Sequence, residues 1–132
     1  MNRLILLMAL VGLVASCKPD FQEQLDQTIY NLNSECPQQV DSETKLTGIT
    51  GGQPLTVNYH YSLVNLDRAN VDTSLFKKAM WPGLLAYIKV SEGLKTMREN
   101  GVTFIYDYHD KANHPICTIQ IGPVDYSSGT AK

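Results

Sequence analysis

The chain has 132 residues, with 11 lysines and arginines against 13 aspartates and glutamates, and a formal net charge of −2 at pH 7. This length suits one domain. The balanced charge provides no basic patch, so we expect no nucleic acid among its partners.

Residues 1–16 are typical of a bacterial export signal. Arg3 supplies a positive charge, and an apolar run extends from Leu4 to Val14. That run is shorter than the roughly 20 apolar residues of a membrane-spanning helix, but it fits the apolar core of a signal peptide. The small residues Ala15 and Ser16 follow.

The four residues from Val14 to Cys17 resemble the lipobox of bacterial lipoproteins, in which cleavage occurs before a cysteine that receives lipid. The resemblance implies acyl chains on Cys17, and several chains on one residue give a stable anchor. Lys18 stands where an aspartate resembles an inner-membrane retention signal, so we expect an outer-membrane lipoprotein that faces the periplasm. The alternative is an ordinary secretory signal with a cysteine near its cleavage site.

The rest of the chain divides into three parts. Residues 17–20 form a short tether, residues 21–126 a single α+β domain, and residues 127–132 a loose tail. The domain begins with apolar residues at helical spacing, which predict a helix: Phe21, Leu25, Ile29 and Leu32. Alternation then predicts a weak strand over 40–50 and a clearer one over 55–63, with a turn at Gly51-Gly52.

A second helix is expected after Asp72, Thr73 or Ser74, any of which can cap it. Its apolar spacing continues to Met97, and Pro82 predicts a kink or two helices that meet there. Two more strands follow over 102–109 and 116–121. The order is helix-β-β-helix-β-β, which predicts an antiparallel sheet of about four strands covered by helices on one face.

Two cysteines remain if Cys17 carries lipid. An exported protein with Cys36 and Cys117 left over is expected to join them in a disulfide. The alternative is two buried free thiols.

Polar side chains gather around the second predicted hairpin turn. Asp107, His109, Asp110 and His114 offer imidazoles and carboxylates, which are weak candidates for a metal site. The alternative is a solvated turn. His60 could pair with Asp107 or His109 as a general acid and base, or simply face outward. The sequence has no Gly-x-Ser-x-Gly elbow, no phosphate-binding glycine loop and no His-Glu-x-x-His motif, so we expect no cofactor and no enzyme activity. A small periplasmic hydrolase or metal-dependent enzyme that uses this hairpin is the alternative.

Tyrosines recur on two of the predicted strands. In matched alternation they would line one side of the sheet, either packed beneath the helices or exposed as a binding surface: Tyr59, Tyr61, Tyr106 and Tyr108. Trp81 has the same two interpretations, a packed kink or an exposed apolar elbow.

Two segments resemble a family of small uncharacterised exported bacterial lipoproteins. They are the run over residues 33–41, continuing to Thr44 and Leu46, and the block over residues 101–110. A looser similarity, in layout and in Cys117, is to the pilotins, outer-membrane lipoproteins that escort secretin subunits. The stable anchor, the short tether and the lack of a convincing reactive site together predict a membrane-anchored adaptor, chaperone or inhibitor that binds another envelope protein.

Overall fold

The structure is a computed structural model that describes residues 20–128. The predicted signal peptide, Cys17 and residues 129–132 lie outside the described residues. The elements in chain order are α1 (Phe21–Ser34), β1 (Gln38–Gln39), β2 (Thr44–Gly52), β3 (Thr56–Leu63), the 3-10 helix η1 (Arg68–Asn70), α2 (Thr73–Val90), the 3-10 helix η2 (Glu92–Leu94), α3 (Lys95–Glu99), β4 (Thr103–His109), β5 (Pro115–Ile121) and α4 (Pro123–Ser127).

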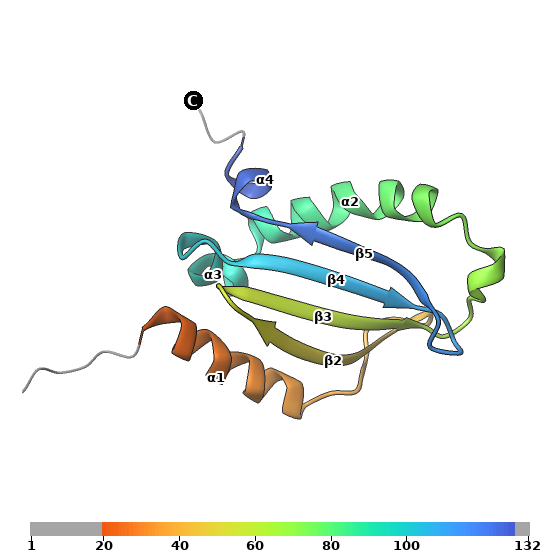
Figure 1. Ribbon diagram of the computed structural model, residues 1–132, viewed down its shortest axis with the longest axis horizontal. Coiled ribbons are helices and arrows are strands. Elements are labelled where there is room, and N and C mark those ends of the chain that lie inside the picture. The colour runs from red at the N-terminus through yellow and green to blue at the C-terminus, as the bar shows by residue number, and fades with distance from the viewer. Residues whose placement is uncertain (1–19, 129–132) are drawn as a thin grey trace, which may run out of the picture.

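The strands form one sheet in the order β1-β2-β3-β4-β5 (Figure 1). Strands β3 and β4 are parallel, whereas the other neighbouring pairs are antiparallel. The α+β class was predicted correctly, but a purely antiparallel sheet of four strands was wrong. The long connection through α2 and α3 returns the chain to the end of the sheet where β3 began, and a crossover of this kind makes the two strands parallel.

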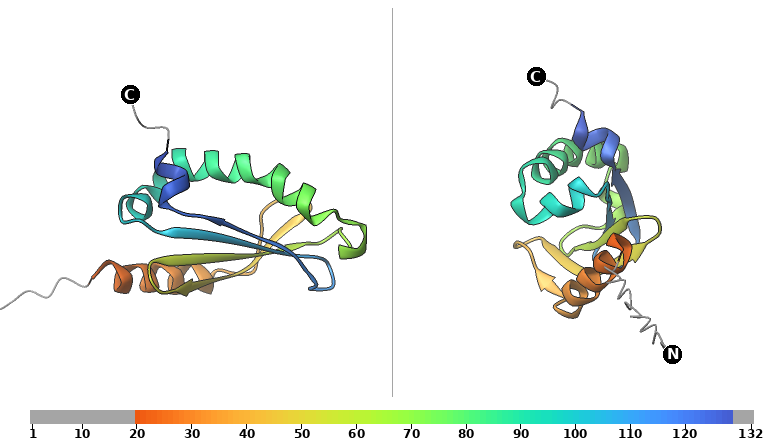
Figure 2. Two further views of the ribbon diagram at one scale, coloured as in Figure 1. Left: turned by 45° about the horizontal axis from the view of Figure 1, so that its top comes forward. Right: turned by 90° about the vertical axis from the view of Figure 1, so that its left-hand side faces the viewer.

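Both long helices pack on the same face of the sheet, which carries the apolar core. On this face Phe76 of α2 meets Tyr108 of β4 with ring centroids 5.2 Å apart. Ile29 of α1 lies over Gly51 of β2, within 3.1 Å of where a Cβ would stand. In Figure 1, α1 runs along β2 and α2 along β5, and in the left view of Figure 2 the two helices again lie at opposite margins of the sheet.

Helix α2 continues through Pro82 as one helix, so of the two alternatives the one with two helices that meet at Pro82 is wrong. The helix is continuous to Val90. Pro82 is exposed, so water can satisfy the carbonyl that loses its intrahelical partner. The helix ends instead at Ser91, where the guanidinium of Arg98 donates hydrogen bonds to the carbonyls of Ile88 and Ser91.

The described part of the chain ends in ordered structure. Ser127, assigned to the loose tail, still belongs to α4. Tyr126 is buried and its hydroxyl donates to the carbonyl of Val102 at 2.8 Å. None of the helices within residues 20–128 combines the length and the apolar character needed to cross a membrane.

Candidate binding groove

Four tyrosines share the face of the sheet that carries the helices. Parallel pairing sets Tyr59 opposite Tyr106 and Tyr61 opposite Tyr108. The rings stack: centroids of each of these pairs are 5.3 Å apart, and those of Tyr61 and Tyr106 are 6.3 Å apart. Tyr106 and Tyr108 are buried, while Tyr59 and Tyr61 are half-buried. The tyrosines are therefore partly core, as one interpretation held, and partly open.

The four tyrosines, called the tyrosine row below, all have raised pKa values. Burial raises the pKa of Tyr61 to about 12, with a further contribution from Tyr87. Burial also raises the pKa of Tyr59, Tyr106 and Tyr108 far above the usual value, and neighbouring phenols add to the effect. At neutral pH the row is uncharged, which suits it to apolar contacts.

A groove runs over this row between α1 and α2. One part of about 470 Å³ has Tyr59, Tyr61 and Tyr106 as its floor. Its two walls stand on the same face of the sheet: Thr28, Leu32 and Glu35 from α1 and its end form one, and Tyr87, Leu94 and Met97 from α2, η2 and α3 form the other. Leu32 and Tyr87 are exposed at its rim.

The groove continues along α2 toward the start of that helix. A second part of about 420 Å³ is lined by Leu63, Leu66, Phe76, Met80, Leu84 and Tyr108, and it shares Tyr61 with the first part. Asp41 and Glu43 line its other side. The two parts together, called the tyrosine groove below, are apolar along the floor and acidic at one margin.

Trp81 lies apart from the tyrosine groove. It is half-buried and packs against the core, and it lines neither part of the groove. Tyr87, which the sequence analysis did not single out, is 57% exposed at the rim. Tyr87 lies in the apolar run of α2, where the sequence alone does not distinguish a residue at the groove rim from a residue of the core.

Cys36 and Cys117 are free thiols in the structure, so the expected intrachain disulfide is absent. Cys36 precedes β1 at one edge of the sheet, whereas Cys117 is in β5 at the other. Strands lie about 4.8 Å apart, and a disulfide needs Cα atoms within about 7 Å. Burial raises the pKa of both thiols, which lowers their reactivity.

The opposite face of the sheet carries a chain of polar contacts. His60 Nε2 lies 2.7 Å from Thr50 Oγ1, and His60 Nδ1 lies 3.2 Å from Asp107 Oδ2. The hydroxyl of Thr118 donates to Asp107 Oδ1 at 3.2 Å, and His109 Nδ1 lies 3.8 Å from Asp107 Oδ2. The predicted contact between His60 and Asp107 is thus present.

This contact chain orders a hydroxyl, an imidazole and a carboxylate as a nucleophilic site would. Such a site also needs backbone donors for an oxyanion and a cavity for substrate. Here the backbone of β3 and β4, which carry His60 and Asp107, is paired with a strand on each side, and His60 and Asp107 line none of the described pockets. The arrangement therefore ties four strands together on this face.

Asp110 and His114 form a separate cluster at the β4–β5 turn. The buried carboxylate of Asp110 accepts hydrogen bonds from the backbone amides of Arg68, Ala112 and His114, and from the His114 ring at 3.1 Å. Burial alone would raise the pKa of Asp110, but these bonds outweigh it and hold the pKa well below its usual range. No three metal-binding side chains converge anywhere in the described range.

The protein is a small α+β domain with a mixed sheet, both long helices on one face and a groove between them. Solved structures of other proteins share this fold. A protein of Pseudomonas aeruginosa thought to be secreted has the same fold, with a TM-score of 0.66, 13% identity, and coverage of 80% of this chain and 91% of that one. The type 2 secretion pilotin EpsS of Vibrio vulnificus matches with a TM-score of 0.58 and 11% identity, over 80% of this chain and 94% of that one. The type II pilotin AspS of Vibrio cholerae matches with a TM-score of 0.57 and 8% identity, over 79% and 90%.

The sequence gives a second, independent assignment. The chain belongs to the family described as a domain of unknown function, DUF8479, which matches residues 20–117. Comparison with curated protein sequences found no significant match.

Proposed function

We propose that this protein is a lipoprotein of the bacterial cell envelope that binds a helical segment of another envelope protein in the tyrosine groove. The groove itself is the observation that carries the proposal. Its apolar floor and partly exposed tyrosines match the composition of protein-binding surfaces. The function is non-enzymatic, in keeping with the pilotin fold.

The shape of the groove favours a helix as its occupant. Strands β3 and β4, which form the floor, are central strands, so their backbone groups are paired with neighbours and cannot bind an added strand. Only side chains contact the occupant, which is the mode in which an amphipathic helix binds a groove. The wall from Phe76 in α2 to the C-cap Ser91 spans about 22 Å at 1.5 Å per residue, or about four helical turns.

The partner class follows from the structural neighbours. Two of them are pilotins of type II secretion systems. We therefore propose a secretin-like subunit as the partner. Acyl chains on Cys17 would hold the groove close to the outer membrane, because few residues separate that cysteine from the start of α1 at Phe21.

Photocrosslinking in the native envelope tests the groove directly. A photoreactive amino acid placed at Tyr87, at the groove rim, should capture one dominant envelope protein. The matched control is Val90, which is 74% exposed on the same helix and does not line the groove. Equal capture from both positions would contradict the assignment of the groove.

The anchor is tested separately with Cys17→Ser. The variant should lose metabolic labelling by palmitate, while the purified protein should still bind its partner. Labelling that persists in the variant would contradict lipidation at Cys17 without affecting the groove.

A further inference from the structure

Strand β2 leaves part of its outer edge without a neighbouring strand. Strand β1 pairs with Leu46 and Lys45 alone, so β2 is the outermost strand from Gly48 to Gly52. Thr50 and Gly51 are exposed there. An exposed edge presents backbone groups that can pair with an added strand.

The direction of these backbone groups follows from one contact. The amide of Ile49 donates to Asn33 Oδ1 at 2.8 Å, so it points away from β3 and toward α1. In an antiparallel pair, residues alternate between bonding to the partner strand and pointing away from it. The amide and carbonyl of Gly51, two residues later, therefore also point outward, as does the carbonyl of Ile49.

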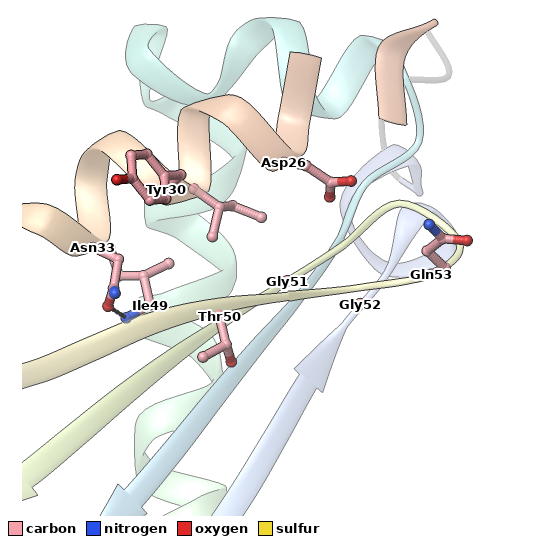
Figure 3. A pocket seen from close by; sticks show the side chains of 9 residues that line it. Asp26, Tyr30, Asn33, Ile49, Thr50, Gly51, Gly52 and Gln53 are labelled. Atoms are coloured by element: carbon pink, nitrogen blue, oxygen red, sulfur yellow. Dashed lines mark hydrogen bonds between the residues drawn. The ribbon is translucent and has the colours of Figure 1, made fainter. Parts of the chain in front are cut away.

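A pocket of about 460 Å³ lies beside this edge (Figure 3). Residues of α1 line one side and residues 49–53 line the other. The Cβ that Gly51 lacks would point into this space, 3.1 Å from Ile29 Cδ1 and 3.6 Å from Asp26 Oδ1. Side chains opposite each other on paired strands share a face, so a residue paired with Gly51 would enter the pocket.

From this geometry we infer a second docking surface: the Ile49–Gly51 edge adds an extended segment of a partner protein as a strand, with a lysine or arginine of that segment opposite Gly51. The segment runs parallel to β2, so the residues on either side of its basic residue bond to the carbonyl of Ile49 and to the amide and carbonyl of Gly51, while the amide of Ile49 keeps its bond to Asn33. Its basic side chain lays its methylene groups against Ile29 and Tyr30 and its charge against the Asp26 carboxylate.

The charge of the pocket selects this occupant. Asp26 is the one charged residue among the described residues that line it, and its carboxylate is oriented by Gln22 Nε2 at 2.8 Å. Tyr30 is 72% exposed beside it, and an aromatic face favours a cation. Proteins protect such edges with lysine, with proline or with a covering helix. Gly48 to Gly52 contain neither residue, and α1 bonds to the edge at Ile49 while Gly51 is exposed.

Peptide titration tests the surface by backbone NMR of the ¹⁵N-labelled protein. The probe is the blocked peptide Thr-Val-Lys-Val-Thr, in which the lysine shares a face with both threonines. It should shift the amide resonances of Thr50, Gly51 and Asp26 and slow hydrogen exchange at Gly51. The same peptide with glutamate in place of lysine should bind at least fivefold more weakly, and N-methylation of the valine amides should abolish binding.

A charge variant and its matched control complete the test. Asp26→Asn should weaken binding of the lysine peptide about fivefold, the effect of one partly exposed ion pair. Glu23→Gln removes the same charge one turn earlier on the exposed side of α1, and should leave the affinity unchanged.

Three results would overturn the inference. One is equal binding of the N-methylated peptide, because strand addition requires its amides. Another is a response confined to Tyr87 and Leu94, which would place the peptide in the tyrosine groove. The last is a concentration-dependent shift at Gly51 without peptide, which would make a second copy of this chain the occupant.

Discussion

Asp110 shows how a single side chain can fix two loops. Its carboxylate holds the β4–β5 turn through Ala112 and His114 and also binds the amide of Arg68 in η1. The sequence analysis grouped Asp110 with residues that might bind metal, because the same residue types serve both purposes. Asp110 is buried and bonded to backbone amides, so it has the structural role and not that of a metal ligand. The sequence does not show whether a turn residue is buried, because this depends on which distant segments pack over the turn.

The lowered pKa of Asp110 predicts an acid-sensitive stability. Its unfolded-state pKa is about 3.9, so below that pH the unfolded chain binds a proton that the folded chain does not. The stabilisation is therefore complete above about pH 4 and declines as the pH falls toward the folded-state value. Asp110→Asn should lower the urea midpoint at pH 7 and flatten its dependence between about pH 2 and 4. An unchanged acid slope would contradict this role.

The tyrosine row predicts the opposite dependence at high pH. Unfolded tyrosine ionises near pH 10, whereas burial raises the pKa of Tyr61 to about 12. Stability is therefore present below about pH 10 and is lost as the pH rises toward 12. Phenolate absorbance of the row should appear together with the loss of circular dichroism. Tyr61→Phe should reduce the loss of stability between pH 7 and pH 11. An equal loss in the variant and the wild type would contradict the raised pKa of Tyr61.

At the scale of elements, the sequence located most helices and strands and missed how two of them pair. Helix α1 and strand β3 were expected from clear periodicity, and Asp72 caps α2, its side chain accepting from the amide of Leu75. The parallel pairing of β3 with β4 was missed because alternation along a strand is the same in either direction. The two-residue β1 carries too short a pattern to be recognised.

The end of α2 depends on Arg98, which sequence reasoning had not singled out. Its guanidinium bonds to the carbonyl of Ile88 in the last turn of α2 and to that of Ser91, which also accepts from the amide of Leu94. Arg98→Met keeps most of the apolar stem and removes both bonds, so we expect a loss of about 1–3 kcal/mol in the free energy of unfolding. Arg98→Lys should recover part of the loss. Chemical denaturation measures both, and a neutral Arg98→Met would show that water replaces the bonds.

Cysteine placement shows why spacing along a chain is a poor guide to disulfides. Two leftover cysteines suggested a bridge, but three strands separate Cys36 from Cys117. We expect both thiols to react with an alkylating agent in the denatured, unreduced protein, and reducing agent to leave the melting temperature unchanged. A fall of several degrees in the melting temperature on adding reductant would show instead that a disulfide is present.

On the scale of the whole molecule, the two proposed surfaces lie on either side of α1. The tyrosine groove passes Thr28 and Leu32, whereas the β2 edge pocket is lined by Asp26 and Tyr30. The sequence placed the tyrosines on one face correctly. It did not reveal the groove above them, because the space between two helices depends on their packing and not on either helix alone.

The central strand pair also constrains when the fold can form. His60 and Asp107 are neighbours across β3 and β4 although 47 positions separate them in the chain. A chain that emerges vectorially, from a ribosome or a translocation channel, cannot make the middle of this sheet until β4 has been released. Until then the apolar sides of α1 and of the β2–β3 hairpin stay exposed. Contacts between residues this far apart in the chain also form slowly. The topology thus delays completion of the sheet until most of the domain has emerged.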